Sequence, residues 1–102
     1  MNAYFIYDYY SVSGCPKAEL EVMEHARKEW MYWLISEAAL DSVVDSIKRY
    51  QDQVLANNKR LKPVDIRLSD ERYEFNGHRT LHIGSSTLRL RKVMGGIGTY
   101  EF

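Results

Sequence analysis

The sequence predicts an α+β domain in which an antiparallel sheet of about four strands packs on two helices or on one bent helix. Three observations predict it: an aromatic run at the N-terminus, apolar residues at helical spacing between Pro16 and Asn57, and short alternating segments after Pro63. This order of elements is typical of a two-layer domain with the helices on one face of the sheet. It requires the N-terminal strand to return and pair with the C-terminal ones.

Length and composition favour a single domain covering residues 1–102. The chain has 102 residues, of which 45% are hydrophobic, which is enough to form a core and argues against disorder. No apolar run reaches the roughly 18 residues of a membrane span, so we expect no membrane partner. The chain shows no secretory signal, and the lone Cys15 rules out an internal disulfide. We therefore expect a cytoplasmic protein.

The N-terminal segment, Met1 to Val12, is predicted to be a strand because it is dense in aromatic and β-branched residues. Strict alternation puts one set of its large side chains on one face of the sheet: Phe5, Tyr7 and Tyr9. It puts the other set on the opposite face: Tyr4, Ile6 and Tyr10. Since both faces carry rings, we expect a strand in the interior of the sheet.

The stretch from Pro16 to Asn57 is predicted to be helical. Its apolar residues recur at i, i+3, i+4 and i+7 in two stripes. The stripes are Leu20, Met23, Ala26, Trp30, Trp33 and Leu34, and then Leu40, Val43, Val44, Ile47, Tyr50 and Val54. Pro16 suits the first helical position. Residues 30–35 are apolar almost all round, which predicts the most buried turn of the helix.

An unbroken helix of this length would extend about 60 Å, far beyond the size of a compact domain of 102 residues. We therefore place a break between Ser36 and Asp41, where Ser36, Asp41 or Ser42 can cap a second helix. No Gly or Pro lies in that window, so a kinked single helix and a dimer built on one long helix remain alternatives.

The segment after Pro63 is predicted to form the rest of the sheet. Val64–Leu68 alternates, Arg72–Ile83 reads as a hairpin around Asn76-Gly77, and Thr87–Val93 follows the turn Gly84-Ser85-Ser86. A short last strand is predicted over Thr99–Phe102. Thr87–Val93 directs two leucines inward and two arginines outward: Leu88 and Leu90, and Arg89 and Arg91.

The register of the predicted hairpin depends on the turn. A two-residue turn at Asn76-Gly77 separates the apolar residues onto two faces. A three-residue turn with Gly77 in the left-handed region keeps one set together, and we prefer it. That set is Tyr73, Arg79, Leu81 and Ile83.

Formal net charge is zero, but the charges are unevenly divided along the chain. Residues 1–57 hold five Lys and Arg against nine Asp and Glu, a net of −4, and residues 58–102 hold nine against five, a net of +4. The molecule is therefore dipolar if the two parts form separate layers. One face then suits a partner of opposite charge.

No chemical motif predicts catalysis, a cofactor or a metal. Cys15 precedes the helix, where the dipole lowers a thiol pKa, but no His or second Cys can be placed beside it. His78 and His82 are about 13 Å apart on a strand, too far to share an ion. Gly95-Gly96-Ile97-Gly98 lacks the following Lys and helix of a phosphate loop. We expect no enzyme, no cofactor and no catalytic residue.

The eight tyrosines favour a protein–protein interaction module, because Tyr buries much area in interfaces at small entropic cost. The candidate partner-binding residues are Tyr9, Tyr10, Arg89 and Arg91. A protein partner is expected, with a nucleoprotein complex among the candidates. A small phage or mobile-element inhibitor or modulator of a host nucleic-acid-processing complex, similar to anti-CRISPR proteins, has this general character. The sequence leaves the choice between monomer and homodimer open.

The alternative is a small nucleic-acid-binding regulator that uses the basic C-terminal sheet. Its candidate residues are Arg79, Arg89, Arg91 and Lys92. A net charge of zero and four interspersed acids argue against it. Those acids are Asp65, Asp70, Glu71 and Glu74.

Overall fold

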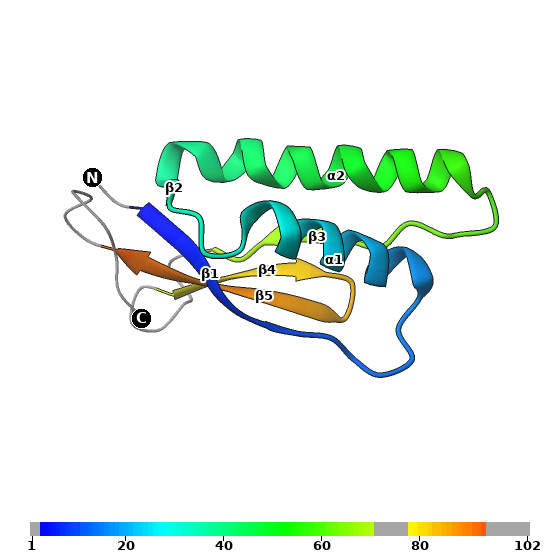
Figure 1. Cartoon of the computed structure of the whole chain (residues 1–102), viewed down its shortest axis with the longest axis horizontal. Coiled ribbons are helices and arrows are strands. Elements are labelled where there is room, and N and C mark those ends of the chain that lie inside the picture. Colours follow the sequence, from blue (N-terminus) through cyan, green and yellow to red (C-terminus); the bar gives the residue numbers. More distant parts are fainter. Residues whose placement is uncertain (1–2, 71–77, 94–102) are drawn as a thin grey trace.

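The computed structural model describes residues 3–70 and 78–93. Over these residues the protein is α+β, with two α-helices lying side by side over one face of a five-stranded antiparallel sheet (Figure 1). The elements are β1 (Ala3–Tyr10), α1 (Lys17–Trp30), β2 (Ile35–Ser36), a 3₁₀ turn (Glu37–Ala39), α2 (Leu40–Asn57), β3 (Ile66–Leu68), β4 (His78–Ile83) and β5 (Ser86–Val93). The predicted α+β class is confirmed, and the sheet has five strands in the described residues where about four were expected.

The strand order is β2-β1-β5-β4-β3. As predicted, β1 returns to pair with a C-terminal strand, β5, and it lies in the interior of the sheet. On its other side β1 pairs with the short β2 through Ala3 and Tyr4. The additional strand β2 lies inside the segment that the sequence predicted to be helical.

A bulge in β1 places the side chains of its last residues on the sheet faces opposite to those predicted. Ile6 lies opposite Leu90 and Asp8 lies opposite Arg89, so Tyr7 is the extra residue. Beyond the bulge Tyr9 lies opposite the buried Leu88, on the helix side. The prediction that Tyr9 shares a face with Phe5 and Tyr7 is therefore wrong.

Tyr10 is reversed in the same way. It lies opposite Thr87, on the face that the helices leave open, whereas Tyr4 and Ile6 belong to the core under the helices. Alternation alone placed it with Tyr4 and Ile6. No residue of the segment is a Gly that would mark a bulge, so the sequence carried no signal for it.

Helix α1 begins just after Pro16, which holds a non-helical ψ of 149° and accepts the N–H of Leu20 through its carbonyl. Pro16 is therefore the cap and not the first helical residue. The helix ends at Trp30, several residues before the predicted break at Ser36–Asp41. The chain thus forms two helices, which excludes the unbroken helix and removes the reason that it gave for a dimer.

The core lies between the helices and the sheet. Helix α2 buries a stripe at helical spacing that consists of Leu40, Val43, Val44, Ile47, Gln51 and Val54. Gln51 is the polar member, and its side-chain amide accepts from the N–H of Val64 at 2.8 Å and donates to the carbonyl of Val64 at 3.2 Å. This pair of bonds fixes the segment that leads from α2 to β3.

Strands β4 and β5 form a hairpin with Gly84 and Ser85 as its two loop residues, since Ile83 lies opposite Ser86. Gly84 has a φ of +61°, the conformation that a two-residue hairpin favours at the first loop position. β3 pairs with the end of β4, from Ile66 opposite Ile83 onward. The predicted turn at Asn76-Gly77, the facing of Tyr73, the Gly95–Gly98 loop and the Thr99–Phe102 strand lie outside the described residues.

Candidate interaction site

The connection between α1 and α2 is an aromatic segment, Trp30 to Ile35. Beyond Trp30 it pairs with the sheet and is not helical. Met31 is extended, with a ψ of 132°, and Tyr32 has a φ of +66°. The N–H of Tyr32 donates to the carbonyl of Ile6 at 3.2 Å, and Ile35 then pairs with Tyr4. Aromatic and β-branched residues lose side-chain freedom in a helix, which makes a helix less favourable for this segment. Its backbone forms hydrogen bonds with β1 instead.

This connection exposes three large apolar side chains in a row. Tyr32 is 51% exposed, Trp33 is 64% exposed and Leu34 is 38% exposed. The prediction that residues 30–35 form the most buried turn is therefore wrong at these three positions, although Ile35 is buried. A contiguous exposed patch of this kind marks an interaction site in proteins more often than a single exposed leucine does.

Two of these side chains, Trp33 and Leu34, border a hollow of about 560 Å³, which we call the aromatic groove. One wall comes from the connection and consists of Trp30, Trp33, Leu34, Ile35 and Ser36. The other wall comes from the 3₁₀ turn and α2 and consists of Ala39, Ser42, Val43, Ser46 and Arg49. The second wall keeps helical spacing over ten residues, so the groove follows α2 for about 15 Å.

The chemistry of the groove is apolar, with a basic group at one end. Small side chains predominate along α2, and two indole rings stand on the other wall. The Trp30 Nε1–H is buried and has no hydrogen-bond partner in the described part of the chain. Arg49 is exposed and makes no ion pair with a described residue. Trp and Arg are the residue types that dominate binding energy in protein interfaces.

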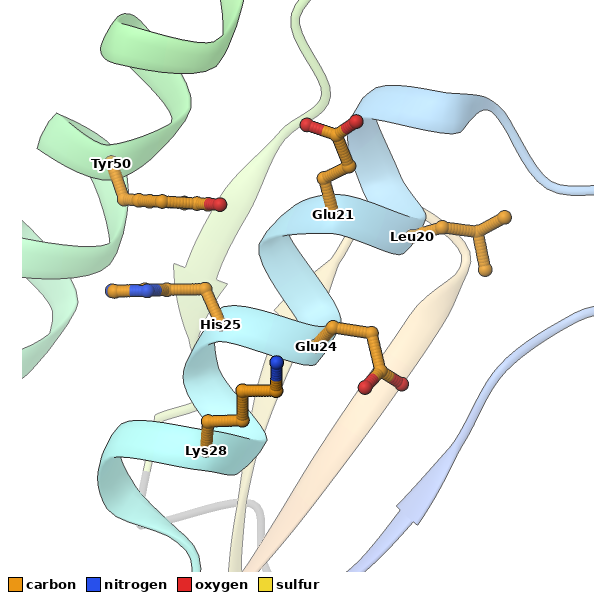
Figure 2. A pocket seen from close by; sticks show the side chains of 6 residues that line it. All are labelled: Leu20, Glu21, Glu24, His25, Lys28 and Tyr50. Carbon is orange, nitrogen blue, oxygen red and sulfur yellow. The ribbon is translucent and has the colours of Figure 1, made fainter.

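A second hollow, of about 410 Å³, lies on the outer side of the two helices (Figure 2). Its centre is a stack of His25 on Tyr50, with ring centroids 3.8 Å apart and an interplanar angle of 5°. Figure 2 shows Leu20 and Glu24 pointing away from this stack. The stack joins α1 to α2.

A buried carboxylate occupies the junction between α1 and the β4–β5 turn. Glu19, in the first turn of α1, is only 1% exposed. Its oxygens accept from the N–H of Ser85 at 2.9 Å, from the hydroxyl of Ser85 at 3.0 Å and from the hydroxyl of Ser86 at 2.7 Å. A Cβ on Gly84 would overlap this carboxylate, so only glycine fits beside it.

Burial and hydrogen bonds at this junction shift the pKa of two groups. Burial opposes ionisation of Glu19, but the hydrogen bonds from Ser86, from Ser85 and from Cys15 outweigh it and lower the pKa of the carboxyl. Burial and the neighbouring Glu19 raise the pKa of the Cys15 thiol. The prediction that the helix dipole lowers the Cys15 pKa is therefore wrong in direction.

The structure places the predicted contact residues on two faces. Tyr10, Arg89 and Arg91 lie together on the helix-free face of the sheet, where all three are exposed. Tyr9 lies on the helix side, with the Arg27 guanidinium 3.7 Å from its ring centroid. The residues of the aromatic groove were absent from the predicted contacts, because periodicity assigned Trp30, Trp33 and Leu34 to a buried stripe.

The basic residues of the nucleic-acid alternative also divide between the faces. Arg79 lies opposite the buried Leu90, and its guanidinium donates two hydrogen bonds to the carbonyl of Ser69, at 2.6 and 3.1 Å. Lys92 lies opposite Tyr4 on the same helix side. Arg89 and Arg91 are the two that face away from the helices.

Within residues 3–70 and 78–93, no group of three or more His, Cys, Asp or Glu side chains is arranged to hold a metal ion. No helix in this part of the chain is long and apolar enough to cross a membrane. No protein-family model, no curated protein and no solved structure matches the chain.

Proposed function

We propose that the protein is a non-enzymatic interaction module whose aromatic groove binds an amphipathic helix of a partner protein. The observation that carries this proposal is the exposure of Trp33 and Leu34 beside a 560 Å³ hollow. Exposing these side chains to water is unfavourable, at about 25 cal/mol for each Å² of apolar surface. A partner that covers them recovers this free energy, which gives the exposed segment a role that folding alone does not supply.

The shape of the groove favours a helix as its occupant. It follows α2 for about 15 Å, which matches about ten residues of a helix lying alongside. The small side chains of Ala39, Ser42 and Ser46 permit close approach of a second helix axis. The bound helix would place residues at i, i+3, i+4 and i+7 against Trp33 and Leu34.

The positive charge at one end of the groove favours one orientation of the bound helix. Arg49 is exposed there and has no acidic partner among the described residues. A cation is favourable beside the C-terminal end of a helix or beside an acidic side chain. The partner helix would therefore present its C-terminal end, or an Asp or Glu, to Arg49.

Helical peptides with an apolar stripe, displayed as a library, supply a probe for this groove. We expect selected peptides to lose at least tenfold in affinity for Trp33→Ala and to weaken several-fold for Arg49→Glu. Tyr10→Ala is the matched control, because it removes a ring of similar exposure, 62%, from the opposite face. Affinities are measured by fluorescence anisotropy, and circular dichroism verifies that each variant is folded.

Two outcomes would overturn the proposal. Selected peptides that bind Trp33→Ala as well as the parent protein would show that the groove is not their site. A concentration-dependent dimer in sedimentation equilibrium that Trp33→Ala dissociates would show that a second copy covers the groove. The narrower prediction, a phage or mobile-element inhibitor of a host nucleic-acid-processing complex, stays a prediction.

A further inference from the structure

The helix-free face of the sheet is a second surface, and strand register defines its members. Residues directly opposite each other on neighbouring strands share a face, so they form cross-strand rows. Three rows face away from the helices in the described residues. They are Tyr10, Thr87, His82 and Arg67; then Asp8, Arg89 and Thr80; then Phe5, Arg91 and His78.

The middle of this face carries two exposed guanidinium groups that form no ion pair within the described part of the chain. Arg89 and Arg91 are two residues apart on β5, which separates their Cα atoms by about 7 Å. Neither makes a salt bridge with a described residue. Asp8 lies opposite Arg89, but its carboxylate accepts the N–H of Tyr9 at 2.8 Å. The carboxylate keeps its charge in that bond and offsets part of the charge of Arg89, but among the described residues no ion pair occupies either guanidinium group.

Arg67, at the far edge of the face, contributes less. Its guanidinium lies 3.3 Å from the carboxylate of Asp65, and both side chains are more than half exposed. Such a pair is nearly neutral as seen by a ligand, although its attraction is weak in water. Among the described residues of this face, the guanidinium groups without an ion pair therefore lie on β5 and not on β3.

Aromatic rings flank the arginines. Tyr10 is 62% exposed and is a diagonal neighbour of Arg89, at a Cα separation of about 7–8 Å that long side chains span. Tyr7 is fixed across the sheet, because its hydroxyl lies 3.1 Å from His78 Nδ1 and the two rings meet edge to face at 5.5 Å. Of the rings that the structure describes on this face, Tyr10 is thus the most exposed, with two guanidinium groups beside it.

We infer that this face binds single-stranded nucleic acid, with Arg89 and Arg91 on backbone phosphates and Tyr10 stacked on a base. Arginine forks bind phosphate oxygens, and an exposed ring beside them accepts a base of any sequence. A duplex offers its phosphates but no free base face, so the surface favours single strands over duplexes. The surface is separate from the aromatic groove, so either proposal can fail without the other.

The test is fluorescence anisotropy with fluorescein-labelled dodecamers of oligo-dT and oligo-U, and with a duplex of the same length. We expect Arg89→Glu/Arg91→Glu to weaken single-strand binding by more than tenfold. Each phosphate contact contributes about −0.7 to the slope of log K against log salt, so the variant should flatten that slope by about 1.4. Tyr10→Ala should weaken binding about tenfold while leaving the slope unchanged.

Lys59→Glu/Arg60→Glu is the matched control, because it makes the same charge change in the exposed segment beyond α2. We expect it to bind like the parent protein. Equal losses in the two double variants would show a general charge effect and overturn the inference. Equal affinity for duplex and single strand would also overturn it. So would heparin that displaces the labelled strand completely and whose own binding is unchanged by Tyr10→Ala. Absence of binding to any strand at about 0.05 M salt would also overturn it.

Discussion

The two ends of α1 meet the sheet in opposite ways. At its start, Glu19 enters the β4–β5 turn and is 1% exposed, with its carboxylate oxygens occupied by serine donors. At its end, the chain turns onto β1 and leaves Trp33 64% exposed beside a hollow. A junction whose polar groups are all satisfied internally has a structural role. A junction that leaves large apolar side chains in water is the one available to a partner.

The largest effect expected is at the closed junction, for Gly84→Ala. Gly84 has a φ of +61°, and an added Cβ would overlap the Glu19 carboxylate. We expect a loss of roughly 3 kcal/mol or more in the free energy of unfolding, measured by urea denaturation with circular dichroism. Gly14→Ala is the matched control, since Gly14 has a φ of +77° with open space around it and should cost about 1–2 kcal/mol. Equal losses for the two variants would show that the Glu19 contact does not restrict Gly84.

A smaller effect is expected for Glu19→Gln, which keeps the shape of the side chain but removes its charge. The amide presents an N–H₂ group to donors that need an acceptor, so we expect a loss of about 1.5–3 kcal/mol at pH 7. Urea denaturation measures it. A variant as stable as the parent protein at pH 7 would contradict the structural role of this carboxylate.

The free energies of unfolding of the parent protein and of Glu19→Gln should also differ in their dependence on pH. The folded pKa of Glu19 is below its ordinary value of 4.5, so the unfolded chain binds the proton first as pH falls. The stability that Glu19 contributes is therefore present above about pH 4.5 and is lost as pH falls from there through the lowered folded pKa. The difference in unfolding free energy between parent and Glu19→Gln should shrink over that range. A difference that stays constant would mean that the pKa of Glu19 is not lowered.

Much of the fold could be predicted from the sequence, because periodicity reports burial. The stripe of α2 from Leu40 to Val54 and the alternation of Leu88 and Leu90 each appear in the core as expected. The return of β1 to β5 followed from the need to complete one sheet. These features depend on local spacing, which a single sequence displays.

The candidate site could not be predicted for two physical reasons. Trp30, Trp33 and Leu34 fit a helical stripe, but the backbone of Tyr32 pairs with Ile6, a tertiary contact that spacing does not reveal. The bulge at Tyr7 reverses the faces of Tyr9 and Tyr10 without any glycine to mark it. One error lies within β1 and the other in the segment that pairs with it. In both places strand pairing outweighed the local sequence pattern.

The smallest effect is expected at the open junction, and it tests the central claim most directly. The measurement is the free energy of unfolding of Trp33→Ser against the parent protein, by urea denaturation. If Trp33 is displayed for a partner and not held in the core, the variant should unfold within about 0.5 kcal/mol of the parent. A loss of more than about 2 kcal/mol would place Trp33 in the core and contradict the account.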